Sequence, residues 1–340
     1  MRRTWMVCHL FLSLLCALGI ALPAVAELPV LLPRDVLFCE PDRYEVQLSP
    51  DGKSIAYLGR DAKNISQLWI RPVDSDQPRQ LTHVMRSCIE DFKFAQQGRS
   101  ILYRWDNNGD EQYRLCRLDI ANGKLTDVMQ TLPGRVMSYQ VHDDYPDLAL
   151  VEIVDPNARK IYRVDLQNQR LDLDIELTAP EWVPDAQFHV GACVVYRRDG
   201  SRDVMRITRK KIPANMQYFD DQGNFSVSSA DREIPQYKRV YHWNRGEQGR
   251  LVTLLNHSQN IVLLTNQKSD TLQLVSIDNA SGKQWVLASD PENDLMRLYG
   301  SGALALAAGI GREQLVWKAI VPEFAEHLDA IRKLQDGMFD

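Results

Sequence analysis

Residues 47–60 read QLSPDGKSIAYLGR and carry the unit that repeats along the chain. The turn at 49–52, Ser-Pro-Asp-Gly, has serine, proline and glycine at the positions that a type I turn favours. A strand-like run, SIAYLGR, follows it directly. The stretch therefore predicts a β-hairpin, and the spacing of similar turns decides whether this hairpin belongs to a repeat.

Similar turns recur with a period of about 46 residues. One series lies at Asp61, Asn107, Asp155 and Asp199, with spacings of 46, 48 and 44 residues. A second series lies at Asp74, Asn122 and Asn168, with spacings of 48 and 46 residues. Four short strands in each period are typical of a β-propeller blade. Such a sheet buries its two faces only by stacking on neighbouring blades around an axis.

The repeat predicts an all-β fold, a β-propeller of four-stranded blades with about five complete blades and a partial sixth. Whether the ring closes is left open by this count. The expected blades span residues 42–84, 86–130, 134–177, 180–225, 250–289 and 294–320. The pattern breaks after Arg209, because residues 210–250 are polar and irregular. Near the C-terminus, the apolar residues Phe324, Leu328, Ile331 and Leu334 share one face, which predicts an amphipathic helix at 321–336.

Residues 1–26 have the composition of a secretory signal peptide. Two arginines precede an apolar run, and Ala-Val-Ala at 24–26 fits a cleavage site. We therefore expect export to the periplasm or the medium, a mature propeller domain at 27–340, and no stable membrane anchor after cleavage. The alternative is an uncleaved membrane anchor.

Four cysteines lie beyond this segment, namely Cys39, Cys88, Cys116 and Cys193. Export would permit disulfides in any of three pairings, and buried free cysteines explain these residues equally well. None has C-x-x-C spacing and the seven histidines form no ligand-like cluster, so we expect no metal and no cofactor. The net charge of −5 argues against a nucleic-acid partner.

Several segments together resemble the N-terminal propeller of the prolyl oligopeptidase family of serine peptidases, and its acylaminoacyl-peptidase-like members above all. They are LLPRDVLF (31–38), QLSPDGKSIAYL (47–58), QLWIRP (67–72), RQLT (79–82), ILYRWDNNGDEQYRLCRLDIANG (101–123) and ASDPENDL (288–295). Residues 316–340 resemble the family's inserted helix. The resemblance implies a propeller, of seven blades in family members, that shields an active site and filters or holds peptides. In the family a C-terminal α/β-hydrolase domain with a Ser-Asp-His triad follows.

The 340 residues contain no G-x-S-x-G nucleophile elbow, and the nearest match, Gly300-Ser301-Gly302, lacks its spacing. No catalytic residue is therefore assigned. We expect an exported propeller module that does not cleave peptides by itself, as in a truncated or split peptidase. The alternatives are a stand-alone periplasmic binding scaffold and the non-catalytic half of a two-chain peptidase. The expected partners are peptides or a chain that supplies the hydrolase domain.

Two acidic pairs are candidate substrate-binding residues, Glu90 with Asp91 and Asp110 with Glu111. The family resemblance implies this role, because propeller carboxylates in some relatives bind a peptide's free amino group. A carboxylate that faces a partly buried channel binds an ammonium ion well. The alternative is that these residues only solvate turns and the rim of the propeller.

Overall fold

The computed structural model describes residues 33, 43–85, 89–107, 109–129, 132–156, 158–214, 217–219, 225–227, 232–255, 257–301, 304–312 and 315–334. Residues from Arg43 onward form one compact unit. The expected signal peptide, Cys39 and Cys88 lie outside the described residues. Cys116 and Cys193 are free thiols, the first partly buried and the second buried.

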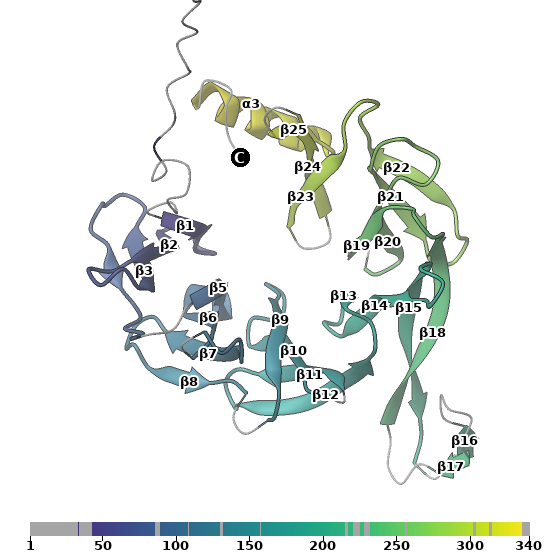
Figure 1. The fold of residues 1–340 in the computed structure, drawn as a ribbon, viewed down its shortest axis with the longest axis horizontal. Coiled ribbons are helices and arrows are strands. Elements are labelled where there is room, and N and C mark those ends of the chain that lie inside the picture. Colours follow the sequence, from purple (N-terminus) through teal and green to yellow (C-terminus); the bar gives the residue numbers. More distant parts are fainter. Residues whose placement is uncertain are drawn as a thin grey trace, which may run out of the picture. The chain divides into compact units, whose positions relative to one another are not determined.

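Six sheets follow one another around a common centre in Figure 1, which confirms the predicted all-β propeller. Five sheets have four strands and the sixth has three, in agreement with five complete blades and a partial sixth. The first three blades are β1 (Arg43–Leu48), β2 (Ser54–Arg60), β3 (Ser66–Pro72) and β4 (Arg79–Gln80); β5 (Ile89–Ala95), β6 (Ser100–Trp105), β7 (Arg114–Asp119) and β8 (Leu125–Asp127); and β9 (Arg135–Val141), β10 (Leu148–Val154), β11 (Arg159–Asp165) and β12 (Arg170–Leu177).

The remaining blades follow the same order. They are β13 (Glu181–Pro184), β14 (Val190–Tyr196), β15 (Arg202–Ile212) and β18 (Arg232–Trp243); β19 (Gly249–Leu255), β20 (Asn260–Thr265), β21 (Gln273–Asp278) and β22 (Gln284–Ala288); and β23 (Leu295–Ser301), β24 (Leu304–Gly311) and β25 (Leu315–Ala319). The short helices are η1 (Gln96–Gly98), η2 (Pro322–Phe324) and α3 (Ala325–Leu334). None of the helices in the described part of the chain has the length and apolar character that crossing a bilayer requires.

The stretch at 47–60 forms the turn and second strand of the first blade. Gln47 pairs with Ala56, and Leu48 pairs with Ile55. Gly52 closes the turn with φ of 70°, a conformation that glycine adopts without steric cost. The Asp51 carboxylate supports the turn, because its Oδ1 accepts hydrogen bonds from the Ser49 hydroxyl at 2.7 Å and the Lys53 amide at 3.1 Å.

Five apolar clusters join each blade to the next, from the first blade to the sixth. Between the fourth and fifth blades, for example, Val194 and Trp243 pack with Ile261 and Leu263, and all four are almost completely buried. The strand alternation explains this arrangement, because each sheet presents one set of side chains to the blade before it and the other set to the blade after it.

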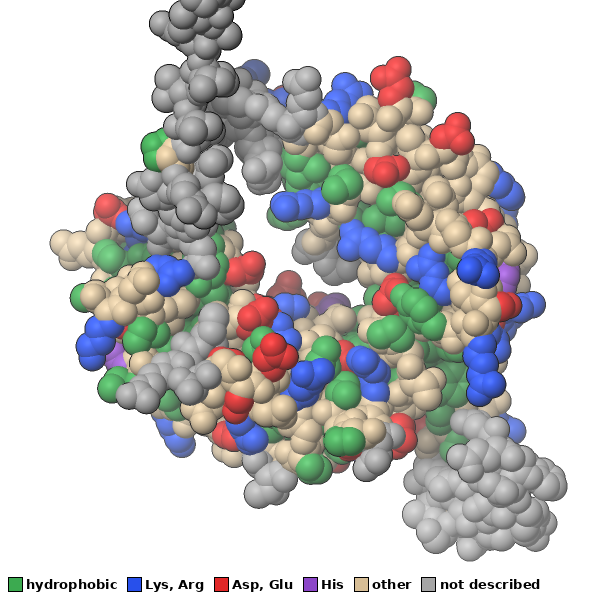
Figure 2. Space-filling view, viewed as in Figure 1, with side chains coloured by type: hydrophobic (Ala, Val, Ile, Leu, Met, Phe, Trp, Pro, Cys, Tyr) green, Lys and Arg blue, Asp and Glu red, His purple; other side chains and the backbone are tan. Residues whose placement is uncertain are grey.

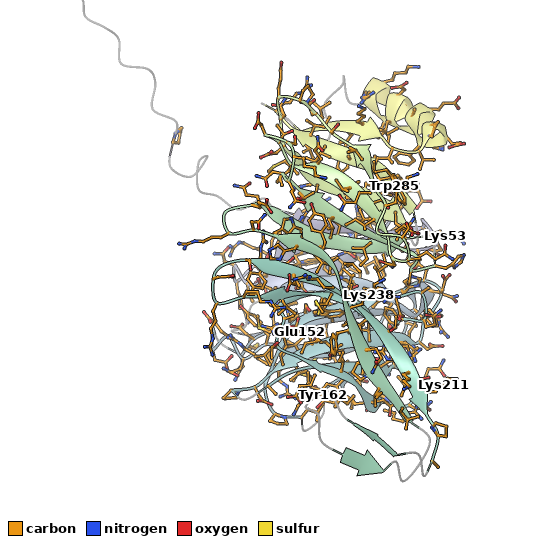
Figure 3. The ribbon with its side chains drawn as sticks, turned by 90° about the vertical axis from the view of Figure 1, so that its right-hand side faces the viewer. Lys53, Glu152, Tyr162, Lys211, Lys238 and Trp285 are labelled. Atoms are coloured by element: carbon orange, nitrogen blue, oxygen red, sulfur yellow. The ribbon has the colours of Figure 1, made fainter. Side chains whose placement is uncertain are left out.

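The fourth blade ends later than the expected residue 225. Its last strand is β18, which pairs with β15 from Arg202↔Trp243 to Ile212↔Arg232. The pair forms a long hairpin that leads to the small sheet of β16 (Gln217–Phe219) and β17 (Phe225–Val227). In Figure 3 the labelled Lys211 lies near the end of this hairpin that points away from the blades. The prediction of an irregular segment here was wrong. The outer part of β15 is mostly exposed, so apolar alternation does not mark it as a strand.

Candidate functional site

The first strand of each blade, β1, β5, β9, β13, β19 or β23, lies nearest the common centre in Figure 1. Polar side chains near these strands are therefore the ones that a molecule in the centre of the propeller meets. Figure 2 shows acidic side chains beside the central hollow on the side of β5, and basic side chains on the side of β19 and β23. The four candidate acids belong to β5 and to the segment before β7.

Asp91 is neutralised by its cross-strand neighbour. Arg104 on β6 donates to Asp91 Oδ2 from Nη2 at 2.7 Å and from Nε at 3.0 Å. The same guanidinium donates to the Met137 carbonyl on β9 at 2.8 Å and lies 4.8 Å from the centre of the Tyr113 ring. Asp91 therefore holds an arginine that connects the second and third blades, and it is poorly placed to bind a further cation.

A partly buried lysine adds to the positive charge around Asp91. Lys93 Nζ donates to the Tyr139 carbonyl at 3.2 Å and lies 5.4 Å from the centre of that tyrosine's ring. Burial lowers the pKa of Lys93, and the nearby Asp91 carboxylate opposes the change. Burial, followed by the charge of Asp91, raises the pKa of Tyr139, so its hydroxyl stays a donor to the Leu102 carbonyl.

The charges of Glu90 and Glu111 both act on Tyr113. Partial burial raises the pKa of this tyrosine, and the negative charges of Glu90, Asp106 and Glu111 raise it further. The two glutamates are exposed, whereas Asp106 is buried. One exposed residue of each predicted pair thus acts on the same phenol, whose pKa the nearby Arg104 guanidinium lowers in turn.

Asp110 supports the turn that carries Glu111. Its Oδ1 accepts hydrogen bonds from the Asn107 amide at 3.3 Å and the Gln112 amide at 3.0 Å. Glu111 itself has φ of 54°, the left-handed conformation in which a non-glycine residue is uncommon. The turn therefore fixes the direction of the Glu111 backbone, and Asp110 is one of the residues that hold it.

Sequence reasoning missed Arg104 and Tyr113 as members of this site. Tyr113 carries the phenol on which both glutamates act. The pairing of Asp91 with Arg104 follows from the register of β5 and β6, in which these residues face each other. That register depends on a shift between Ile89 and Asp91, which the sequence pattern does not reveal.

Among the described residues, two aspartate–histidine pairs are joined by side-chain hydrogen bonds, but their geometry is structural; a third pair, His142 with Asp144, is 3.9 Å apart. Asp203 Oδ1 lies 2.7 Å from His242 Nδ1, and Asp174 contacts His189 Nδ1. The other ring nitrogen of His189 lies 3.0 Å from Arg163 Nη1. Across the described residues, no serine hydroxyl is hydrogen-bonded to either ring, and no group of three or more His, Cys, Asp or Glu side chains could hold a metal ion.

Comparison with known proteins relates the chain to peptidases, although no family model matches it. Over 314 residues it is 25% identical to dipeptidyl aminopeptidase BIII of Pseudoxanthomonas mexicana, an alignment that covers 90% of this chain and 42% of that protein. Over 91 residues it is 32% identical to dipeptidyl peptidase family member 6 of Caenorhabditis elegans, covering 27% of this chain and 12% of that protein. The chain thus spans less than half the length of these curated relatives.

Solved structures with a similar fold include a prolyl endopeptidase, with a TM-score of 0.46 and 11% identity over 78% of this chain and 38% of that one. The β-propeller domain of the Trilobed protease from Pyrococcus furiosus has a TM-score of 0.47 and 10% identity over 79% of this chain and 80% of that one. With its six consecutive blades and its sequence similarity to a dipeptidyl aminopeptidase over nine-tenths of its length, this chain resembles the β-propeller of the prolyl oligopeptidase family, as its sequence predicted.

Proposed function

We propose that this propeller admits and holds peptides for a peptidase, and that the chain itself does not cleave them. The observation that carries the proposal is the exposure of Glu90 on the inner strand β5 and of Glu111 in the segment before β7, whose charges both act on Tyr113. Exposed carboxylates can bind the ammonium group of a peptide N-terminus through charge-assisted hydrogen bonds. The relationship to a dipeptidyl aminopeptidase supports a peptide as the ligand.

We propose the absence of catalysis because the sequence offers no nucleophile motif and the described residues include no histidine that is hydrogen-bonded to a serine. No G-x-S-x-G motif occurs in the sequence, and both aspartate–histidine pairs bind within the blades. In this proposal a hydrolase domain is the partner, and it lies elsewhere in the same protein or in a separate chain. We expect the purified chain neither to hydrolyse aminoacyl or peptidyl chromogenic substrates nor to react with a fluorophosphonate probe.

Export is part of the same proposal and rests on the composition of residues 1–26. Expression of the whole sequence in a bacterium, followed by fractionation and N-terminal sequencing, tests it. We expect the recovered chain to begin at Glu27 and to lie in the periplasm or the medium. Recovery of the uncleaved chain in the membrane would support the anchor instead.

Binding of a short peptide tests the role of the two glutamates. Calorimetry should show that N-acetylation of the peptide weakens binding about tenfold, because a hydrogen bond to a charged group contributes about 1.5 kcal/mol or more. Glu90→Gln and Glu111→Gln should each weaken binding of the free-amine peptide and leave the acetylated peptide unaffected. Glu176→Gln, which changes an exposed glutamate on β12, is the matched control.

A stand-alone binding scaffold remains the second candidate function, because a propeller can bind a ligand without any enzyme attached. Equal binding of the free-amine and acetylated peptides would contradict the proposed ammonium site. Labelling of a serine by the fluorophosphonate probe would contradict the proposed lack of catalysis.

A further inference from the structure

A cavity of about 290 Å³ lies between β19 of the fifth blade and β23 of the sixth. These are the first strands of their blades, so the cavity lies beside the central hollow (Figure 1). Aliphatic residues such as Val252, Leu255 and Leu298 take part in its lining, although polar atoms supply more of its surface. Its volume is near the lower end of the range of about 300–1,000 Å³ that is usual for small-ligand sites, which suits one or two residues of a peptide.

Arg250 is the charged residue of this lining. Its Nη2 donates to the Met296 carbonyl at 3.2 Å, which ties the guanidinium of β19 to the neighbouring blade. A guanidinium has five N–H donors, and in the described part of the chain no carboxylate lies within salt-bridge distance of this one. Arg104 and Arg312, in contrast, are paired with Asp91 and Asp290 at 2.7 and 2.9 Å.

A guanidinium that is held at an aliphatic cavity without a counter-ion is suited to an anion. Its planar fork matches the two oxygens of a carboxylate, and the aliphatic lining would contact the carbon atoms next to that carboxylate. Neither Asp nor Glu is among the described residues of the lining, although the Glu181 carboxylate accepts a hydrogen bond at 3.2 Å from the amide of the lining residue Leu251.

We infer that the cavity at Arg250 binds a carboxylate of the peptide that the propeller holds. The inference rests on the proposed function and adds a second recognition point to it. Glu90 and Glu111 would bind the amino group on the side of β5, and Arg250 would bind a carboxylate on the side of β19. Figure 2 shows the corresponding separation of acidic and basic side chains across the hollow. The carboxylate belongs either to the C-terminus of the peptide or to an acidic side chain.

Calorimetry with four short peptides tests the inference and separates these two sources. One peptide has an alanine-rich sequence and a free C-terminus, and the second is its C-terminal amide. The third is the amide with one alanine replaced by glutamate, and the fourth is the first peptide with its N-terminus acetylated. We expect amidation to weaken binding to the unchanged protein about tenfold if the C-terminal carboxylate is bound. If an acidic side chain is bound, the glutamate-containing amide should bind about tenfold more tightly than the plain amide.

Arg250→Gln should remove the advantage of whichever peptide carries the recognised carboxylate, while Arg198→Gln, in the turn after β14, should keep it. An unchanged melting temperature of Arg250→Gln would show that the fold is intact. Equal binding of all the free-amine peptides, with weaker binding of the acetylated one, would overturn this inference and leave the ammonium site standing. No binding of any of the four peptides would overturn both.

Discussion

Glu152, on β10 in the third blade, has a carboxylate whose neutralisation we expect to destabilise the fold by about 3 kcal/mol. Its side chain is only 3% exposed. It accepts hydrogen bonds from the Ser138 hydroxyl at 2.5 Å and from Trp182 Nε1 of the fourth blade at 3.2 Å, and it forms an ion pair with Arg159 on β11. Figure 3 places Glu152 well inside the stack of blades.

The magnitude follows from what each substitution leaves behind. Removal of one partner of a buried ion pair costs about 3–5 kcal/mol, because the other charge stays buried without compensation. Arg159 is 22% exposed, so Glu152→Gln should fall at the lower end of that range. Arg159→Met leaves the carboxylate buried and should cost at least as much, about 3–4 kcal/mol. The double variant leaves neither charge, and the glutamine amide can still bond to Ser138 or Trp182, so its cost should be only about 1 kcal/mol.

Urea unfolding followed by tryptophan fluorescence measures these free energies, provided that the slope of the transition is unchanged. Glu152→Gln should also lower the melting temperature by roughly 6 °C, at about 2 °C per kcal/mol for a domain of this size. The exposed pair Arg170–Asp172 at 2.9 Å, on β12 of the same blade, is the control. Arg170→Met should change stability by less than about 0.5 kcal/mol. A double variant as unstable as the two single variants combined, about 6 kcal/mol, would refute the reasoning.

Three further predictions concern stability. Burial raises the pKa of Cys193 to about 12, so iodoacetamide at pH 8 should label it only after unfolding, as read by mass spectrometry. In the unfolded chain the pKa of this thiol is about 8.5, so the unfolded chain loses the proton first as the pH rises. The free energy of unfolding should therefore decrease between about pH 8.5 and pH 12, and Cys193→Ala should make this decrease smaller. Burial opposes ionisation of Asp203, but hydrogen bonds from His242 and Arg197 lower its pKa overall. The stability that the ionised Asp203 contributes should therefore be complete above about pH 3.9 and should be lost on further acidification. Asp203→Asn should lower the melting temperature more at pH 7 than at pH 3. Gly249→Ala would place a Cβ 2.4 Å from Trp243 Nε1 and 2.7 Å from the Leu264 carbonyl, so urea unfolding should show a loss of about 1–3 kcal/mol; an unchanged midpoint would contradict this packing.

The propeller could be predicted from the sequence because its turns carry their own chemical signals. Asp, Asn and Gly recur at the same points in each blade, and the intervening runs are apolar on both faces of the sheet. The β15–β18 hairpin could not be predicted in the same way. Most of its outer residues meet solvent, and only Ile212 among the last five residues of β15 is buried, so the strand carries no apolar alternation there.

The candidate site was only partly accessible from sequence. The acids Glu90 and Glu111 could be named as candidates, but their shared effect on Tyr113 depends on how β5 and the segment before β7 fold together. Asp91 differs from Glu90 only in its pairing with Arg104, which the register of two strands decides. Arg250 gave no signal, because its cavity exists only where the consecutive fifth and sixth blades pack side by side.

The five apolar clusters also determine the order in which we expect the blades to unfold. Each middle blade contributes to two clusters, so its loss would expose two apolar surfaces to water. Within the described residues, the first and sixth blades each contribute to one cluster. Cooperativity in such a chain of neighbours is greatest in the interior, so amide hydrogens should exchange with solvent first in the first and sixth blades and last in the third and fourth.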